Sequence, residues 1–401
     1  MTNIAILGFG VVGGGVAELI TKNNKEVTSL GGDEINIKYI LDLRDFPNSP
    51  FADKVVHDFS LILGDKEVDT VIEVMGGSHP AYEYTVAALS AGKNVITSNK
   101  EVVANFGDEF LALAKENGVS YRFEASVGGG IPVLSPIISF IKHNKIKEVS
   151  GILNGTTNYI LTKMFTYGDS FEESLADAQA RGYAERNPDA DILGTDACRK
   201  ITILAALITG KLFPTSEIHA EGITGIRRED VSTLDKLGLK IKLLGRCIIP
   251  EDSAPFVMVA PFVLSCDSAL SGVSDVYNAI EVVGDPIGRV MFYGPGAGAG
   301  STASAVVGDL MQIMRSGTST APVAFEKCDI KEASDFGSFK TRHYLALPSE
   351  CENSAKCAFE GASFLVADNE CALITESISE KELNEKLSSL GITPLSHIRF
   401  L

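Results

Sequence analysis

A dense group of acidic and basic residues lies between Gly182 and Lys200. Asp196 and Lys200 are four residues apart, so on a helix their side chains share one face. In one interpretation they form an ordinary surface pair worth ~0.3–0.5 kcal/mol, and Asp189 and Asp191 cap the start of the helix. In the other they form a polar pocket, in which carboxylates hold an ammonium group and the lysine donates a proton. Spacing alone does not choose between the two.

A glycine-rich segment near the start of the chain could hold phosphates. The pattern Gly8-x-Gly10-x-x-Gly13 follows a predicted strand and begins a predicted helix. Val11 and Val12 are the two residues between Gly10 and Gly13. In this context Gly8 permits a tight turn, Gly10 lets a pyrophosphate approach the backbone, and Gly13 lets the helix pack closely on the strand. The N–H groups at the start of the helix then face the phosphates. We therefore expect a dinucleotide site rather than a plain strand–helix turn.

Two residues after the second predicted strand bear on the choice between NAD and NADP. Asp42 could accept a hydrogen bond from a ribose 2′-hydroxyl and favour NAD, whereas Arg44 could bind a 2′-phosphate and favour NADP. Asp42 also lies farther beyond Gly13 than the ~20 residues of the simple fingerprint. The preference therefore stays open.

Lys100 follows a predicted strand over 94–97, at the edge where open α/β sheets bind ligands. It could contact a carboxylate, a phosphate or a developing alkoxide, but most lysines are merely solvated. Its position alone leaves both interpretations open.

The elements that must position these groups alternate between strand and helix over the first third of the chain. Strands are predicted over 3–8, 35–41, 69–75, 94–97 and 120–124, and helices over 12–23, 81–91 and 109–117. This alternation predicts an α/β fold, with a Rossmann-type doubly wound parallel sheet as a dinucleotide-binding domain over 1–135. An apolar helix near 302–320 is expected to complete that domain.

The pattern changes after the glycines at 128–130. Strands are predicted over 147–153, 241–249, 256–264 and 279–283, with helices from 158, after the capping box at Ser170, and over 191–209. These elements predict an α+β domain over 136–300. Residues 338–401 are expected to form a small appended module, with a strand, a loop, two strands, a capped helix from Ser379 and a final strand.

Composition excludes several classes of partner. The chain has 52 acidic and 35 basic residues, a net charge of −17, and no run of five basic residues, so nucleic acids and anionic membranes are not expected partners. Seven dispersed cysteines do not form a disulfide framework or a Cys-x-x-Cys site, which favours a cytoplasmic location. The six histidines are never three or four residues apart, so no helical zinc pair is expected. No apolar run approaches the ~20 residues that span a bilayer.

A long gapped pattern carries a family resemblance. The run from Ala178 to Lys200 resembles the signature of homoserine dehydrogenases at each of its fixed positions. Other stretches resemble the same family, and together they extend over nearly the whole of residues 1–320: 8–13, 74–77, 97–100, 124–132, 151–159, 237–245 and 292–309.

The resemblance implies NAD(P)-dependent interconversion of L-aspartate 4-semialdehyde and L-homoserine, in the pathway towards threonine and methionine. It implies that Lys200 is the proton donor, that Lys100 lies near cofactor and substrate, and that Glu185 faces the substrate ammonium. The other positions implied for the substrate are Asp196, Asp191, Tyr183 and Thr156, and those implied to border the nicotinamide are Gly182 and Gly298. In this chain Glu185 is followed by an arginine where many relatives have proline.

The resemblance also implies an alkali-metal ion, Na⁺ or K⁺, held mainly by backbone oxygens at Glu124, Val127, Gly129 and Ile131. The alternative is that the glycines at 128–130 simply turn the chain between domains. A homodimer or higher homo-oligomer is implied in the same way, with the 136–300 domain at its interface.

The C-terminal segment from Thr341 resembles a shortened ACT module, the amino-acid-sensing unit of longer homoserine dehydrogenases. Residues 349–361 lack the Pro-Gly turn and apolar helix that such modules use at the ligand edge. A packing or dimerisation unit is therefore the preferred interpretation of residues 338–401.

Two rival functions remain for comparison. Another Rossmann amino-acid dehydrogenase, such as aspartate dehydrogenase, would explain the glycine loop but not residues 178–200. A non-enzymatic nucleotide-sensing regulator would need a DNA-binding or docking element, and the acidic composition supplies none.

Overall fold

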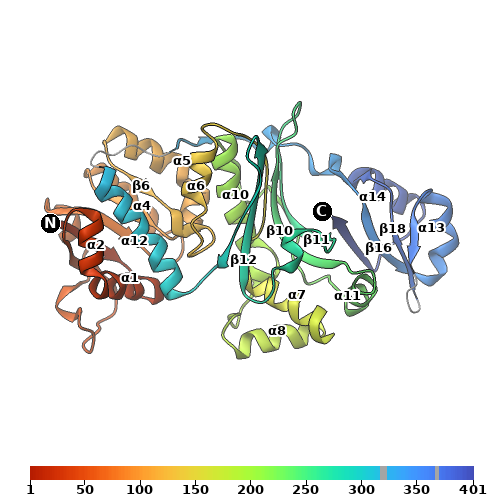
Figure 1. Ribbon diagram of the computed structural model, residues 1–401, viewed down its shortest axis with the longest axis horizontal. Helices are drawn as coiled ribbons and strands as arrows, with labels where there is room; N and C mark the ends of the chain where they lie inside the picture. Colours follow the sequence, from red (N-terminus) through yellow and green to blue (C-terminus); the bar gives the residue numbers. More distant parts are fainter. Residues whose placement is uncertain (317–322, 366–369) are drawn as a thin grey trace. The chain divides into compact units, whose positions relative to one another are not determined.

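The computed structural model describes residues 1–316, 323–365 and 370–401 of the chain. It contains two compact units (Figure 1). The first comprises Met1–Asn144, Thr202–Thr215 and Gly294–Cys328, and the second comprises Lys145–Ile201, Ser216–Tyr293 and Asp329–Leu401.

The first unit contains the predicted parallel sheet. Its six strands have the order β3-β2-β1-β4-β5-β6, and every neighbouring pair is parallel. This is the strand order of a doubly wound dinucleotide-binding fold, so the predicted fold class of this region is confirmed. The strands are β1 (Thr2–Leu7), β2 (Ile35–Leu41), β3 (Val55–Val56), β4 (Val68–Glu73), β5 (Asn94–Thr97) and β6 (Tyr121–Arg122).

Helices cover this sheet, and one of them returns from far along the chain. Helix α12 packs on α1, and Val306 and Leu310 share a buried cluster with Ile4 and Ile6 of β1. Residues 317–320 of the helix expected over 302–320 lie outside the described residues. The helices are α1 (Val11–Lys22), α2 (Asn24–Gly31), α3 (Phe59–Gly64), α4 (Ala81–Ser90), α5 (Lys100–Glu116), α6 (Leu134–Phe140) and α12 (Ala299–Ser316). A small parallel pair joins β8 (Lys211–Leu212) to β14 (Glu326–Lys327).

The second unit is built on a ten-stranded sheet. Its order is β13-β12-β7-β10-β11-β20-β16-β18-β17, and β9 pairs with β11 off this path. The strands before residue 300 are β7 (Lys145–Ile152), β9 (His219–Ala220), β10 (Lys240–Ile248), β11 (Phe256–Leu264), β12 (Tyr277–Asp285) and β13 (Gly288–Pro295). Strand β13 was not predicted, although residues 290–293 form a short apolar run; only Gly294 of this strand is buried.

The helices of this part are α7 (Gly155–Tyr167), α8 (Phe171–Ala180), α9 (Asp189–Ile192), α10 (Thr195–Thr209) and α11 (Arg228–Asp235), and α10 belongs to the first unit from Thr202 onward. The capping box at Ser170 is confirmed, because its hydroxyl accepts from the Glu173 N–H and the Glu173 carboxylate accepts from the Ser170 N–H.

The single helix predicted over 191–209 is wrong. The chain instead forms the short α9 and then α10, with a break at Gly194, where φ is +83°. A Cβ at Gly194 would lie 3.3 Å from the Glu221 carbonyl oxygen, and one at Gly222 would lie 1.9 Å from the Ile192 oxygen. Close packing of the 221–222 backbone therefore bends the chain between Asp191 and Asp196.

The last part of the chain forms a β-α-β-β-α-β sequence within the same sheet (Figure 1, blue). Its elements are β16 (His343–Pro348), α13 (Glu352–Ala358), β17 (Ser363–Leu365), β18 (Glu370–Ile374), α14 (Glu380–Ser389) and β20 (Ser396–Phe400), and a separate pair joins β15 (Lys340–Thr341) to β19 (Ile378–Ser379). The loop expected after the first strand of this module is wrong in part, because α13 forms there around the buried Ala355. Strand β20 lies between β16 and β11, so the sheet is continuous.

None of the described helices is both long enough and apolar enough to cross a membrane.

Candidate active site

The glycine loop has the geometry of a phosphate-binding turn. Gly8 follows β1 with φ +98°, a conformation that favours glycine. A Cβ on Gly13 would lie 2.0 Å from the Gly8 carbonyl oxygen, whereas one on Gly10 would meet nothing within 4 Å. Gly10 caps α1 without a side chain, and the first turn of that helix contains no acidic residue. The first N–H groups of a helix have no partner within the helix, so with no side-chain cap and no acidic residue they suit an anion.

A pocket of about 450 Å³ adjoins this loop within the first unit. Its lining includes Gly8 and Gly10, the strand-end residues Asp42 and Arg44, and the exposed Leu43. The lining also includes Met75 and Gly76, from the segment after β4, and Tyr84 of α4. The residues present fit the adenosine and pyrophosphate part of a dinucleotide, which needs a glycine turn, a strand-end polar group and an apolar wall.

Both carboxylate oxygens of Asp42 already accept hydrogen bonds from other groups of the protein. One carboxylate oxygen accepts from the Phe9 N–H at 2.8 Å and from Arg44 Nη2 at 3.0 Å. The other accepts from the backbone and Nε nitrogens of Arg44 at 3.0 and 2.9 Å. The bond to the Arg44 guanidinium holds the pKa of Asp42 well below its usual range. Asp42 thus fixes both the glycine loop and the position of Arg44.

A buried carboxyl group joins the ends of β4 and β5. Glu73 Oε2 accepts from the Thr97 hydroxyl at 2.6 Å, and Oε1 accepts from the Met75 N–H at 2.8 Å. Burial raises the pKa of Glu73 to about 7. Asn99 caps α5 by accepting from the Glu101 N–H, so Lys100 is the first residue of that helix. This network was not predicted from the sequence, although one acidic residue within an apolar strand was a visible signal.

Glu124 uses its carboxylate to hold a helix. Its two oxygens accept from the N–H groups of Val133, Leu134 and Ser135 and from the Ser135 hydroxyl, at 2.6–2.8 Å, and these donors lie at the start of α6. The Glu124 N–H donates to the carboxylate of Asp309 on α12, and burial raises the pKa of Asp309 to about 7. Any contact of Glu124 with a cation would therefore come from its backbone oxygen.

The other positions of the expected cation site lie on a tightly packed turn. Val127 and Ile131 are buried, and a Cβ on Gly129 would lie 2.5 Å from the Gly296 carbonyl oxygen. Gly129 has φ +56°. Gly298 follows in the facing loop, just before α12, with φ +123°. Backbone atoms of two loops thus meet here, and both belong to the first unit.

In the second unit, Asp196 and Lys200 form a nearly buried pair on α10. Lys200 Nζ donates to Asp196 Oδ2 at 2.7 Å and to the Leu153 carbonyl oxygen at 2.7 Å. Their side chains are only 12% and 9% exposed. An ordinary surface pair would be solvated and bound to nothing outside its helix, so the geometry favours the polar-pocket interpretation.

Asn154 connects this pair to Asp191. Its side-chain nitrogen donates to Asp191 Oδ1 at 2.7 Å and to Asp196 Oδ2 at 2.9 Å. Its oxygen accepts from the Thr157 N–H at 2.9 Å and caps α7. Burial raises the pKa of Asp191, which lies inside α9 and does not cap it, so that part of the surface-pair interpretation is wrong. The Asn154 amide therefore joins the two carboxylates, and Asp196 also binds the Lys200 ammonium.

The loop after α8 carries the remaining predicted substrate residues. Gly182 has φ +75°. The Thr156 hydroxyl donates to the Tyr183 carbonyl at 2.7 Å, and the Tyr183 ring contacts Tyr159 edge to face with centroids 4.9 Å apart. Glu185 is exposed, and its carbonyl accepts from the Gln179 side chain at 3.0 Å. The structure thus ties Thr156 and Tyr183 together and holds Glu185 through its backbone, leaving its carboxylate toward solvent.

Comparisons with known proteins cover both units. A family model described as "Homoserine dehydrogenase, NAD binding domain" matches residues 8–124, and one described as "Homoserine dehydrogenase" matches residues 132–311. The homoserine dehydrogenase of Synechocystis sp. is 40% identical over 317 residues, covering 78% of this chain and 73% of that protein. That of Helicobacter pylori is 36% identical over 386 residues, covering 95% of this chain and 88% of that protein.

Solved structures agree. A crystal structure of a homoserine dehydrogenase from Thiobacillus denitrificans has a TM-score of 0.89 at 31% identity, covering 100% of this chain and 98% of that one. A hyperthermophilic archaeal homoserine dehydrogenase mutant in complex with NADPH has a TM-score of 0.67 at 28% identity, covering 79% and 98%. The chain belongs to the homoserine dehydrogenase family.

Proposed function

We propose that Lys200 is the proton donor of this chain's homoserine dehydrogenase reaction, and that Glu185, Asp191 and Asp196 hold the substrate. The activity itself, NAD(P)-dependent interconversion of L-aspartate 4-semialdehyde and L-homoserine for threonine and methionine synthesis, follows from the family. The observation that carries the residue assignment is the nearly buried Lys200–Asp196 pair, which Asn154 ties to Asp191. The family match favours this activity over an aspartate dehydrogenase or a nucleotide-sensing regulator.

The chemistry assigned to Lys200 follows from its contacts. A bound nicotinamide supplies the hydride in the reducing direction, and negative charge then grows on the substrate oxygen. Within the described residues, Asp196 and the Leu153 carbonyl take two of the three N–H groups of Lys200, so one remains for that oxygen. An ammonium held in this way stabilises the charge and transfers its proton. Lys100, at the start of α5, is proposed as the second amine of the reaction.

Glu185→Ala tests the substrate assignment. We expect the KM for L-homoserine to rise at least about tenfold, because a charged contact with the substrate ammonium is lost. The KM for the cofactor should stay unchanged, since the glycine loop is untouched. The measurement is a spectrophotometric assay of homoserine oxidation with NAD or NADP.

Glu172→Ala is the matched control, because Glu172 is an exposed acidic residue of the neighbouring α8. An equal rise in KM in both variants would contradict a specific role for Glu185. No homoserine oxidation by the parent protein would contradict the activity itself.

We propose that Arg44 binds the 2′-phosphate of NADP, because the Asp42 oxygens are already filled by Arg44 and the backbone. The Arg44 side chain is 63% exposed at the pocket. Arg44→Ala should therefore raise the KM for NADPH about tenfold and leave that for NADH nearly unchanged. Initial rates with both cofactors measure this, and equal effects on both would remove the assignment.

We also propose a Na⁺ or K⁺ ion on the backbone oxygens of Glu124, Val127, Gly129 and Ile131. The supporting observation is that the Glu124 carboxylate is committed to α6, while backbone from two loops meets at Gly129. Activity should fall severalfold when potassium chloride is replaced by tetramethylammonium chloride at equal ionic strength. Equal rates in the two salts would count against the ion.

The remaining proposals concern organisation. Residues 1–135 with the helix near 302–320 would form the cofactor domain, 136–300 the substrate and dimerisation domain, and 338–401 an ACT-like module. The β-α-β-β-α-β order of that module supports the last assignment. A homodimer in the cytoplasm is proposed from the family. Light scattering of the purified chain measures the assembly.

A further inference from the structure

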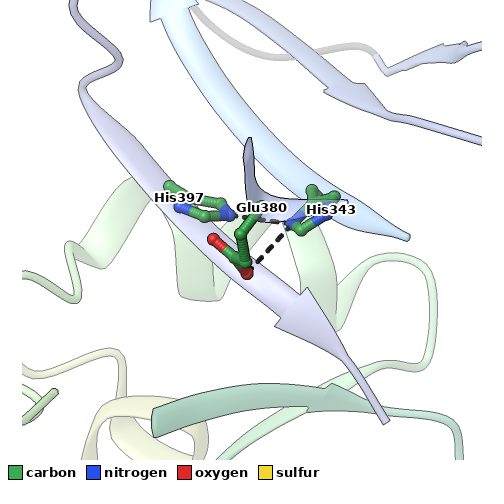
Figure 2. Close-up of side chains that lie close together, drawn as sticks. All are labelled: His343, Glu380 and His397. Carbon is green, nitrogen blue, oxygen red and sulfur yellow. Dashed lines mark hydrogen bonds and ion pairs between the residues drawn. The ribbon is translucent and has the colours of Figure 1, made fainter. Parts of the chain in front are cut away.

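Three potential metal ligands meet in the C-terminal part of the second unit, and none of them is among the residues assigned to the reaction. Figure 2 shows His343, Glu380 and His397 pointing toward one another. One ligand atom from each side chain lies within 4.8 Å of the other two. His343 and Glu380 are buried, and His397 is partly buried.

Strand pairing explains how residues far apart in sequence come together. β16 and β20 are antiparallel, and His343 lies opposite Arg399, two residues beyond His397. The two histidines are therefore diagonal neighbours on one face of the sheet. Glu380 is the first residue of α14 and comes from a third element. Histidine spacing along the sequence could not reveal this group.

The hydrogen bonds set the tautomer of His343. Its Nε2 lies 3.2 Å from the Ile378 carbonyl oxygen, which can only accept, so Nε2 carries the proton. Nδ1 therefore accepts from the His397 Nε2–H at 2.9 Å and lies 3.9 Å from Glu380 Oε1, and a metal ion would bind both nitrogens once the proton of His397 is on its other ring nitrogen. A backbone carbonyl on the far nitrogen is the usual outer-shell partner of a metal-binding histidine.

The charged side chains around the three ligands have a net negative charge, which a cation could balance. Arg399 donates to both oxygens of Glu380 and, at 2.6 Å, to Glu221 Oε2. Two carboxylates thus surround one guanidinium, with an excess of one negative charge beside the two histidines. Arg399 orients the Glu380 carboxylate, as outer-shell donors do for carboxylate ligands. The same guanidinium repels a dication, so the affinity should be moderate.

We propose that His343 Nδ1, His397 Nε2 and Glu380 form a binding site for a divalent transition-metal ion of the zinc type. Two imidazoles and one carboxylate suit Zn²⁺ or Co²⁺, whereas Mg²⁺ and Ca²⁺ prefer oxygen ligands alone. A tetrahedral ion would have these three ligands and one water. The ion would join β16, β20 and α14, and so stabilise the C-terminal part of the sheet.

The test uses the full chain after treatment with a chelator. Zn²⁺ in competition with a chromophoric chelator should bind at one equivalent per chain, and Co²⁺ should give the visible absorption bands of a tetrahedral nitrogen and oxygen site. His397→Ala and Glu380→Gln should each weaken binding at least about tenfold. His143→Ala, which removes an exposed histidine, is the matched control and should bind as the parent does.

Circular dichroism establishes that both variants fold, and Glu380→Gln retains the shape of the carboxylate if the alanine variant is unstable. The seven free cysteines are the competing ligands. Cobalt bands typical of thiolate ligands, retention of binding in both variants, or no binding by the parent would each overturn the proposal.

Discussion

Lys200→Ala is expected to lower kcat about 10³-fold, the largest effect of any single substitution in the substrate pocket. Proton transfer by a positioned group contributes roughly 10²–10⁴-fold to rate, and this ammonium also stabilises the growing charge on the oxygen. Asp196 and Asn154 stay in place without the amine, so the KM for homoserine should change far less. Steady-state kinetics and NADPH fluorescence measure turnover and cofactor binding separately.

Lys240→Ala is the control, because Lys240 also pairs with an aspartate, Asp235, but its side chain is 37% exposed. Its kcat should equal that of the parent. A Lys200→Ala enzyme with parental turnover would show that another group delivers the proton, and Lys100→Ala would then be the next variant to measure.

Three glycine substitutions should separate cofactor binding from folding. Gly13→Ala should lower the free energy of unfolding by about 3 kcal/mol and abolish cofactor binding, because its Cβ would lie 2.0 Å from the Gly8 oxygen. Gly10→Ala should leave stability nearly unchanged, since its Cβ meets nothing within 4 Å. The methyl group would nevertheless occupy the place of the pyrophosphate and weaken cofactor binding at least about tenfold.

Gly14→Ala is the matched control, because it lies on the same helix with nothing within 4 Å of its Cβ. Alanine there should raise stability by up to ~1 kcal/mol through helix propensity. Denaturant unfolding and NADPH titration measure the three variants. Full cofactor affinity in Gly10→Ala would show that the phosphates bind elsewhere.

The first sheet was predictable because its information is local. Each of its main strands is a short apolar run, and the glycine pattern sits between β1 and α1, where a turn is required. The break at Gly194 was not predictable, because its cause is the backbone at 221–222, which approaches only in the folded chain. The sequence around Asp196 has helical spacing on both sides of Gly194, so it predicted one continuous helix.

Some features of the substrate pocket could likewise be predicted from the sequence, and others could not. The Asp196–Lys200 pair could be found from a four-residue spacing, but its burial and the Leu153 carbonyl that fixes Lys200 come from a neighbouring strand end. Asn154 bridges two aspartates that lie far along the chain. His343 and His397 meet only because β16 and β20 pair, so no spacing rule along the sequence would find them.

Strand β20 lies inside the sheet of the second unit, parallel to β11 and antiparallel to β16. Without it, β11 and β16 would each have an unpaired edge, and such edges recruit other strands. Removal of residues 396–400 should therefore produce a chain that aggregates rather than a shortened enzyme.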